Sequence, residues 1–390
     1  MTLRQRGFAA EIVMIGDEAA PPYERPPLSK SYLTGDTPRE KLLLQPEERW
    51  REQGVEWRGR TRAVAIDRAR HQLELQDRDE IGYSTLVLAT GSQPNHLLVP
   101  GAQLPGVMTL GNLEDADGLL AKLAARPRVV VVGGGFLGCE LAAAARELGC
   151  EVTILEMGRA LLPGLGEEAG SQALRLQQQH GATVRLGTTV TKVVGGPTVG
   201  AVELGDGSAI ACELVLACIG SRPRVELAAA SGLRAGSGIQ VDGTCRTSDP
   251  AIYAAGDVAS FWHPALRRRV RLEHWDNAQR QGAHAAQAIL GSQQKYRPTP
   301  YFWSEQYDYL IQQVGFARPG QERVLRGIPD SGSFSVLYLQ GRRVAACLAV
   351  NRYPDLAAAR RLIDSNAMVN PEVLRDPEAD LRAISMGTVS

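Results

Sequence analysis

Hydrophobic positions in the middle of the chain follow a strand-like pattern, then a helix-like one, then a strand-like one again. Residues 129–132 are four consecutive valines, which is typical of a buried strand. An alanine-rich apolar run follows at 141–148, and Gly149 stands where a helix commonly ends. Residues 152–155 are again apolar or β-branched and lead to Glu156. The pattern predicts a strand, a helix and a second strand, in that order.

Three glycines connect the first strand to the helix. Gly133, Gly135 and Gly138 have the spacing that permits a tight turn, a close approach to a pyrophosphate and tight packing of helix on strand. The helix N-terminus then faces the phosphate charge, and Glu156 can accept hydrogen bonds from an adenosine ribose. We interpret this unit as a dinucleotide site rather than as glycines that serve packing alone. The carboxylate favours NAD(H) over NADP(H), although Arg159 follows closely in the sequence.

Part of the same pattern occurs at the start of the chain. Residues 3–6 resemble the last turn of a helix, Gly7 its cap, and residues 11–15 a strand that leads to Asp17. Residues 83–94 also parallel residues 212–223, and each segment follows a meander of short strands. We interpret the repeat as two related dinucleotide-binding domains.

The repeat also predicts what the first copy lacks. In the second copy the first glycine of the turn precedes the cap glycine by 16 residues (149 − 133). The same offset counted back from Gly7 falls ahead of Met1. We therefore expect the first strand and glycine turn to be absent from the N-terminal domain, unless that domain never had a glycine fingerprint.

Further candidates lie on the segments outside these units. The proline-rich segment 21–30 ends at Lys30, which is either a cation beside a cofactor or a solvated lysine at a helix start. A short strand ends at Gly256 and Asp257, which places a carboxylate at the sheet edge where ligands bind. Trp275 begins an alanine-rich helix whose N-terminus offers a positive dipole.

The last 90 or so residues predict a small α+β domain. Aromatic residues are concentrated at 301–307, around Trp303, which we consider an interface candidate. Strands are expected at 311–315, 333–339 and 343–350, and helices at 355–364 and 377–382.

Composition excludes several classes of function. Lys plus Arg and Asp plus Glu both number 43, so no overall field recruits nucleic acid or an anionic membrane. The six cysteines show no C-x-x-C spacing, and the six histidines form no H-E-x-x-H motif, so no metal site is predicted. The N-terminus does not resemble a signal peptide, and the apolar runs are too short to span a bilayer. We expect a cytoplasmic protein.

Five motifs together resemble one family. They lie at 22–30, 86–91, 133–140, 247–257 and 302–307. The chain resembles the FAD-dependent NADH:ferredoxin reductases of bacterial Rieske-type aromatic-ring dioxygenase systems, within the pyridine nucleotide-disulfide oxidoreductase superfamily.

The resemblance implies an α/β fold with two Rossmann-like FAD/NAD-binding domains of the glutathione-reductase type and a C-terminal α+β domain. Residues 1–108 and 237–299 would form the FAD domain, residues 109–236 the NAD domain, and residues 300–390 an interface domain.

The resemblance also implies roles for individual residues. Lys30, Glu140 and Trp303 would act in electron transfer, with Glu140 near Lys30 and the nicotinamide, and Trp303 at the flavin edge. The residues implied at FAD are Asp17, Arg25, Lys30, Ala63, Thr90, Gly91, Gly256, Asp257 and Trp275. Those implied at NAD are Gly133, Gly135, Gly138, Glu156 and Gly220. The family commonly has an arginine at the flavin where this chain has Gly111.

The expected reaction follows from the resemblance and the cysteine positions. Residues 1–110 contain no cysteine, so electrons cannot leave through a dithiol beside the flavin. They are expected to pass singly from NADH, through FAD, to a [2Fe–2S] ferredoxin of a dioxygenase system. Two alternatives stay open: a reductase of rubredoxin or of a small molecule on the same architecture, and an NAD(H)-binding protein without bound flavin.

Overall fold

The structure is a computed structural model, and it describes residues 1–376 and 379–381. The chain divides into two compact units, which we describe separately. The first comprises Met1–Pro27, Thr37–Gln93 and Ser221–Pro298. The second comprises Leu28–Asp36, Pro94–Gly220 and the described part of Thr299–Ser390.

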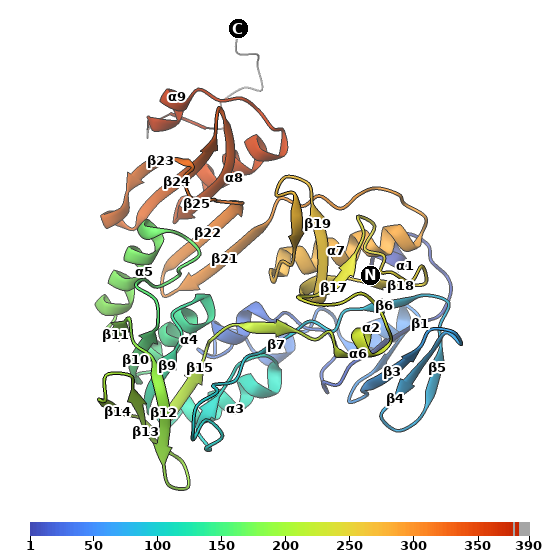
Figure 1. Cartoon of the computed structure of the whole chain (residues 1–390), viewed down its shortest axis with the longest axis horizontal. Helices are drawn as coiled ribbons and strands as arrows, with labels where there is room; N and C mark the ends of the chain where they lie inside the picture. Colours follow the sequence, from blue (N-terminus) through green and yellow to red (C-terminus); the bar gives the residue numbers. More distant parts are fainter. Residues whose placement is uncertain (377–378, 382–390) are drawn as a thin grey trace. The chain divides into compact units, whose positions relative to one another are not determined.

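A five-stranded parallel sheet forms the first half of the second unit (Figure 1). Its strands, in spatial order, are β11 (Thr183–Leu186), β10 (Glu151–Glu156), β9 (Arg128–Val132), β15 (Leu214–Ala217) and β8 (Val107–Met108). The helices of this half are α3 (Leu113–Leu123), α4 (Phe136–Glu147) and α5 (Glu167–Gln179). The four valines of β9 and all of β15 are buried, as expected of strands covered on both faces.

The end of α4 has the predicted glycine cap. Gly149 has a φ of +85°, and its N–H donates to the carbonyl of Arg146, while the N–H of Cys150 donates to that of Ala145. This pair of bonds is a Schellman motif, in which the left-handed residue is usually glycine. It turns the chain directly into β10.

The first unit contains the second copy of this arrangement. Helix α1 (Thr2–Gln5) ends in the same motif, because Gly7 has a φ of +82° and the N–H groups of Gly7 and Phe8 donate to the carbonyls of Arg4 and Leu3. Strand β1 (Ile12–Ile15) follows and pairs in parallel with β2 (Val55–Arg58). The predicted repeat is therefore confirmed down to its cap hydrogen bonds.

Each copy also has its meander. In the first unit it comprises β3 (Ala63–Asp67), β4 (Gln72–Leu75) and β5 (Glu80–Gly82). In the second unit it comprises β12 (Val190–Gly195), β13 (Val199–Leu204) and β14 (Ala209–Ala211). Both meanders are antiparallel throughout, as predicted.

The remaining strands of the first unit form small sheets. Strand β18 (Ile252–Ala254) pairs in parallel with β6 (Leu86–Leu88). Strand β19 (Ala259–His263) joins β17 (Ile239–Val241) to β20 (Arg268–Val270), with which it forms an antiparallel hairpin. The predicted alanine-rich helix is α7 (Trp275–Ile289).

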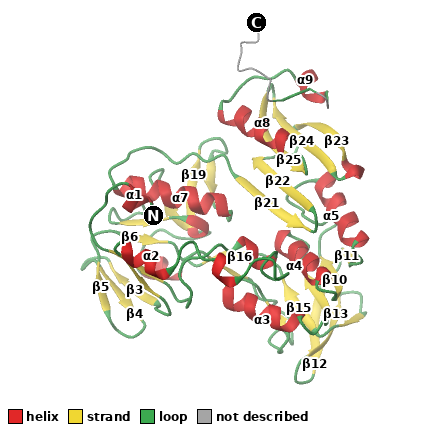
Figure 2. Ribbon diagram, turned by 180° about the vertical axis from the view of Figure 1, so that it is seen from behind, coloured by secondary structure: helices red, strands yellow, loops and turns green. Residues whose placement is uncertain are grey.

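The C-terminal part of the second unit is an antiparallel sheet covered by a helix. Its strands, in spatial order, are β21 (Tyr301–Gln306), β22 (Tyr309–Gly315), β25 (Arg343–Val350), β24 (Ser333–Gln340) and β23 (Glu322–Ile328). Figures 1 and 2 show α8 (Tyr353–Asp364) lying along this sheet, and its buried face joins the same apolar core.

Two strands and one short helix of this domain differ from the sequence prediction. The aromatic segment 301–307 is itself a strand, β21, and β23 was not predicted because its apolar residues are interrupted by charged ones. The short α9 (Pro371–Arg375) was also missed. Of the helix expected at 377–382, residues 377, 378 and 382 lie outside the described residues, and 379–381 are not helical.

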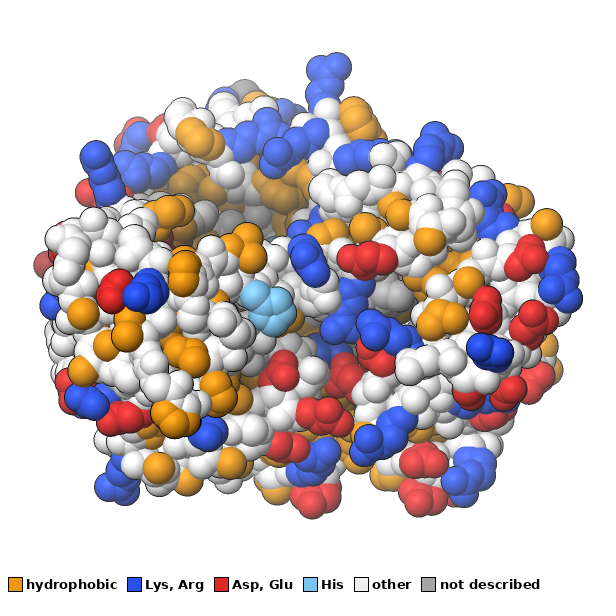
Figure 3. All heavy atoms as spheres, turned by 60° about the horizontal axis from the view of Figure 1, so that its bottom comes forward, with side chains coloured by type: hydrophobic (Ala, Val, Ile, Leu, Met, Phe, Trp, Pro, Cys, Tyr) orange, Lys and Arg blue, Asp and Glu red, His pale blue; other side chains and the backbone are white. Residues whose placement is uncertain are grey.

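One face of the molecule carries charged side chains of both signs (Figure 3). On the face drawn in Figure 3, basic and acidic side chains are both scattered among neutral and hydrophobic ones. Within residues 1–376 and 379–381, no helix has the length and apolar character needed to cross a bilayer.

Candidate active site

The glycine turn between β9 and α4 has the geometry of a pyrophosphate cradle. A Cβ on Gly133, whose φ is +107°, would lie 2.3 Å from the carbonyl oxygen of Cys218, so the tight turn requires glycine. A Cβ on Gly138 would lie 1.9 Å from the carbonyl oxygen of Gly133, so helix and turn touch there. A Cβ on Gly135 would meet no atom within 4 Å. The open position and the start of α4 at Phe136 therefore fit a dinucleotide phosphate.

Glu156 ends β10 and holds the glycine loop. Its Oε2 accepts a hydrogen bond of 2.6 Å from the N–H of Gly134, and its Oε1 accepts one of 2.6 Å from the N–H of Gly158. Bonds of this kind, from amides to a carboxylate, are stronger than bonds between neutral groups. Glu156 therefore shapes the loop in addition to its predicted contact with an adenosine ribose, which stays a prediction.

Glu140 lies in the second turn of α4 and forms a buried ion pair. Its Oε2 is 3.0 Å from the Nζ of Lys30, and the exposed fractions of the two side chains are 7% and 12%. The hydroxyl of Ser29 donates to the same Oε2 at 2.6 Å, and the hydroxyl of Ser304 donates to Oε1 at 2.7 Å. The reading of Lys30 as a solvated lysine is therefore wrong, and its predicted proximity to Glu140 is confirmed.

The two serines at Glu140 were missed in the sequence. Ser29 is adjacent to Lys30, so its position in the same motif was a usable signal. Ser304 is next to Trp303, and because strand side chains alternate between faces it points away from the face that carries Trp303. Recognition of 301–306 as a strand would have separated these two faces.

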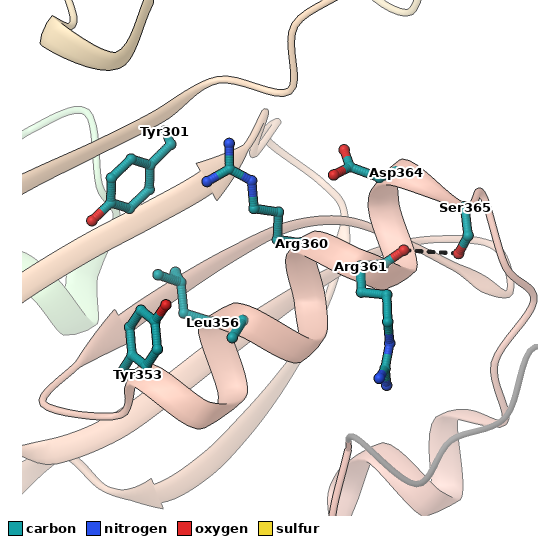
Figure 4. Close-up of a pocket in the computed structure, with 8 residues that line it drawn as sticks. Tyr301, Tyr353, Leu356, Arg360, Arg361, Asp364 and Ser365 are labelled. Carbon is teal, nitrogen blue, oxygen red and sulfur yellow. Dashed lines mark hydrogen bonds between the residues drawn. The ribbon is translucent and has the colours of Figure 1, made fainter.

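Trp303 lies on the outer face of β21 among polar and aromatic partners. Its Nε1 donates to Glu305 at 2.9 Å, and its ring stacks on that of Tyr301 with 5.9 Å between centroids. The guanidinium carbon of Arg360 lies 5.6 Å from the centroid of the Tyr301 ring. Figure 4 shows Arg360 reaching from α8 toward this ring, at a pocket that Tyr353 and Leu356 also line.

Two predicted ligands of the first unit, Gly256 and Asp257, are held by side chains of that unit. The hydroxyl of Ser92 donates to Oδ2 of Asp257 at 3.3 Å, and Gly256, whose φ is +78°, donates its N–H to the side chain of Gln281 at 2.9 Å. Burial, followed by the charge of Glu273, raises the pKa of Asp257 above its ordinary value. A buried carboxyl with one long hydrogen bond is suited to accept bonds from ligand hydroxyls.

Other predicted residues of this unit are held by protein partners. Asp17 Oδ2 lies 3.6 Å from Nη1 of Arg224, a residue that the sequence did not single out. The hydroxyl of Thr90 donates to the carbonyl of Arg224. The N–H of Arg224 donates to the carbonyl of Gly91. Arg25 pairs with Glu18.

The remaining predicted residues are backbone positions. Ala63 is the first residue of β3 and pairs with Leu75. Trp275 is the first residue of α7. Gly220 has a φ of +86°, and its carbonyl accepts from the N–H of Asn95.

Gly111, where the family commonly has an arginine, leaves no room for a side chain. A Cβ there would lie 2.8 Å from Cδ of Pro94. Its N–H donates to Asp115 at 2.8 Å, at the start of α3. The departure from the family pattern is therefore accompanied by local packing that requires a small residue.

Comparison with known proteins identifies the family. Residues 1–282 match the pyridine nucleotide-disulphide oxidoreductase family, and residues 301–385 match the reductase C-terminal family. The chain belongs to the pyridine nucleotide-disulphide oxidoreductases.

Relatives of similar length share this organisation. The chain is 40% identical over 385 residues to the anthranilate 1,2-dioxygenase system ferredoxin–NAD(+) reductase component of Burkholderia cepacia, covering 97% of this chain and 94% of that protein. It is 35% identical over 389 residues to putidaredoxin reductase of Pseudomonas putida, covering 98% and 92%.

Solved structures agree with these relatives. A ferredoxin reductase from Rhodopseudomonas palustris gives a TM-score of 0.94 at 35% identity, over 98% of this chain and 95% of that one. The reductase in the covalent putidaredoxin reductase–putidaredoxin complex also gives 0.94, at 34% identity, over 98% and 93%.

Family membership confirms several of the sequence predictions. The fold is the predicted α/β arrangement with a C-terminal reductase domain, the chain is an oxidoreductase, and the cofactors of this family are FAD and NAD(H). The individual site residues and the three domain boundaries stay predictions. The geometry brings Lys30 and Glu140 together and gathers the glycine turn around Glu156.

Proposed function

We propose that the chain is a cytoplasmic NADH:ferredoxin oxidoreductase of an aromatic-ring-hydroxylating dioxygenase system. One NADH would reduce two ferredoxins and release NAD⁺ and one proton. When bound, FAD supplies the chemistry that divides a two-electron hydride into single electrons. The proposal is supported by relatives named as reductases of dioxygenase systems, which match nearly the whole chain.

The domains take corresponding roles in this proposal. Residues 1–108 and 237–299 would bind FAD, and residues 109–236 would bind NAD. Residues 300–390 would form the surface that meets the [2Fe–2S] ferredoxin. The exposed Nε1 contact of Trp303 with Glu305 favours Trp303 as a residue near that surface.

The buried pair of Lys30 and Glu140 is the observation that carries the proposal. Glu140 lies on α4, the helix that begins directly after Gly135, so the pair lies a short distance along the helix from the nucleotide cradle. A buried lysine supplies positive charge where negative charge develops, and the carboxylate offsets that charge before the reaction. Such an arrangement suits hydride transfer from a nicotinamide.

The cysteines argue against a dithiol as the route for electrons. All six are free thiols in the structure, and Cys139 and Cys218 are the two that lie next to the glycine turn. Burial raises the pKa of Cys218 to about 12, and burial also raises the pKa of Cys139. Neither thiol ionises near neutral pH, so thiolate chemistry is disfavoured at this site. Single-electron exit to a ferredoxin is the better fit.

Preference for NADH is proposed from Glu156. A carboxylate at the end of β10 repels a 2′-phosphate, and its two loop hydrogen bonds fix it at that position. A phosphorylated ribose would have to displace a charge that the loop depends on.

Reduction of cytochrome c tests the proposed acceptor. The flavin-loaded enzyme is supplied with NADH and assayed with and without a [2Fe–2S] ferredoxin from a dioxygenase system. We expect ferredoxin to raise the rate several-fold and in a saturable way. A rate that is indifferent to ferredoxin, and raised instead by rubredoxin or by a quinone, would favour the rubredoxin or small-molecule alternative.

A further inference from the structure

A series of buried polar side chains connects the turn after β21 to Glu140. Tyr307 Oη lies 3.2 Å from Gln177 Oε1, and Gln177 Nε2 lies 3.2 Å from Gln306 Oε1. Gln306 Nε2 lies 3.4 Å from Ser304 Oγ, which lies 2.7 Å from Glu140 Oε1. All five residues belong to the second compact unit. They form a hydrogen-bond chain that joins α5, β21 and α4.

The direction of every bond in this chain is fixed by one main-chain carbonyl. Gln177 Nε2 also donates to the carbonyl of Cys139 at 3.0 Å, and a carbonyl can only accept. The amide oxygen of Gln177 must therefore face Tyr307, and its nitrogen must face Gln306. Gln306 then presents its own nitrogen to Ser304. Because an NH₂ group only donates, the hydroxyl proton of Ser304 is left for Glu140.

The chain is thus polarised toward the carboxylate. Successive bonds with a common direction strengthen one another, and bonds to an ionised acceptor are the stronger kind. Burial raises the pKa of Tyr307, so its hydroxyl stays protonated and able to donate at the far end. Every donor in the series therefore points along the chain toward the carboxylate of Glu140.

Three members of this hydrogen-bond chain are fully buried. Ser304, Gln306 and Gln177 each have an exposed fraction of 0%. Buried amides and hydroxyls are costly unless they are hydrogen-bonded, so loss of one member leaves its neighbour without a partner. The stacking of Tyr307 on His180, at 3.6 Å between ring centroids, holds the remote end in place.

The alternation of β21 explains how one short strand serves two purposes. Trp303 and Glu305 lie on one face and bond to each other, while Ser304 and Gln306 lie on the other face and turn toward α4 and α5. The contact of Phe302 with Phe136, at 4.9 Å between centroids, holds β21 against the start of α4.

We propose that Ser304, Gln306 and Gln177 are positioning residues that hold the side chain of Glu140 against Lys30 for the reaction with NADH. This inference rests on the proposed function, because it assigns these hydrogen-bonded side chains to the hydride-transfer half of that reaction. The residues act through Glu140 and are not themselves catalytic. Their removal should slow reduction by NADH and leave reoxidation by the electron acceptor unchanged.

A double-mutant cycle on the full-length protein tests whether the hydrogen-bond chain couples Gln177 to Glu140. Gln177→Leu and Glu140→Gln alter residues that share no hydrogen bond, yet we expect their effects on the urea midpoint of unfolding to be clearly non-additive. Ser335→Ala is the matched control, since Ser335 is also fully buried and donates to a carboxylate at 2.6 Å, but to Asp355. Its effect should add to that of Glu140→Gln. Additivity in the Gln177 cycle would overturn the proposal.

Rapid-mixing kinetics on the flavin-loaded enzyme test the functional part. Ser304→Ala should slow reduction by NADH roughly 10- to 100-fold, as expected for loss of a hydrogen bond to a charged group. In a Glu140→Gln background the same change should have less than about a twofold further effect. The rate of reoxidation by ferricyanide should equal that of wild type in Ser304→Ala and in the double variant. Gln306→Met, which leaves every direct contact of Glu140 in place, should slow the NADH step by a smaller factor.

The outcomes separate this inference from the proposed function. If wild-type enzyme is not reduced by NADH, the proposed function fails. The double-mutant cycle measured by urea unfolding still shows whether the hydrogen-bonded side chains are coupled. If wild-type enzyme is reduced and Ser304→Ala is as fast as Ser335→Ala, the positioning role is overturned and the proposed function stands. Equal slowing of reduction and reoxidation would indicate a general structural effect and would also overturn the positioning role.

Discussion

The two dinucleotide-binding copies share a cap and a meander but differ in how their central strand is held. Both helices end in the same pair of Schellman hydrogen bonds, at Gly149 and at Gly7. Strand β10 is then paired on both sides, by β9 and β11. Strand β1, among the described residues, is paired by β2 alone, and its four residues are half-buried.

The difference shows what a glycine turn contributes to such a domain. In the second copy, β9 and its turn supply both a neighbour for β10 and backbone N–H groups at the start of α4. In the first copy, the described ligand candidates are side chains and loop backbone around Asp257 and Asp17. On the predicted residues, recognition in the NAD copy would rest mainly on the backbone of the glycine turn, whereas recognition in the first unit would combine side chains with loop backbone.

The largest expected effect comes from filling the turn of the NAD copy. Gly138→Ala places a methyl group 1.9 Å from the carbonyl oxygen of Gly133, so turn and helix must separate. We expect kcat/KM for NADH to fall at least about 100-fold, as for misplacement of a bound substrate by about 1 Å. Gly196→Ala, in the hairpin between β12 and β13, is the control, since its methyl group also meets no atom within 4 Å and lies outside the glycine turn. Equal thermal stability and NADH kinetics in Gly138→Ala and wild type would contradict the assigned packing role.

Truncation of one strand residue in each copy measures the second difference between the copies. Ile154 in β10 is fully buried, whereas Met14 in β1 is half-buried. Ile154→Ala should lower the free energy of unfolding by about 2–5 kcal/mol, and Met14→Ala by about 1 kcal/mol. Urea unfolding, with circular dichroism as the signal, measures both. Equal losses would mean that β1 is as well enclosed as β10.

Removal of charge at Glu156 should have an intermediate effect on binding. Glu156→Gln replaces an acceptor of two short amide bonds by a side chain with one acceptor oxygen, so the glycine loop loosens. We expect KM for NADH to rise about tenfold with little change in kcat, as for loss of one bond to a charged group. Glu151→Gln, at the exposed start of the same strand, is the control and should leave KM unchanged. A fall in kcat alone would contradict a role in binding.

The smallest expected effect concerns the carboxyl of the first unit. Burial raises the pKa of Asp257 above its ordinary value near 3.8. A carboxyl that binds its proton more tightly when folded favours folding below its ordinary pKa, and this contribution is lost as the pH rises through the raised value. Asp257→Asn should therefore be more stable than wild type at neutral pH, and the difference should vanish below about pH 4.

A carboxyl with the opposite shift provides the control for this pH dependence. Hydrogen bonds from Ser208 lower the pKa of the exposed Asp206. Asp206→Asn should therefore be slightly less stable than wild type at neutral pH, with the deficit lost in acid. Thermal unfolding from pH 3 to 8 compares the two variants. Slopes of the same sign would contradict the environment assigned to Asp257.

Much of the fold could be predicted because its signals are local. Runs of valine, the G-x-G-x-x-G spacing and the glycines after α1 and α4 each determine backbone structure within a few residues. Strand β23 was not predicted because charged residues interrupt its apolar pattern. Strand β21 was not predicted because its aromatic residues suggested a surface cluster.

The site was harder to predict because its contacts join distant segments. Ser29 and Ser304 lie 111 and 164 residues from Glu140 in the sequence, and no local pattern indicates that they converge. The ion pair of Lys30 with Glu140 came from a family resemblance, since Lys30 alone suited a solvated position equally well. Gln177 was not considered, because a polar residue on an amphipathic helix ordinarily faces solvent.

Anaerobic mixing of the flavin-loaded enzyme with NADH and, separately, with NADPH tests the central claim most directly. The account predicts rapid loss of the oxidised-flavin absorbance with NADH, slower loss with NADPH, and marked slowing of the NADH reaction in Lys30→Met and Glu140→Gln. Faster reduction by NADPH, or wild-type rates in both variants, would contradict it.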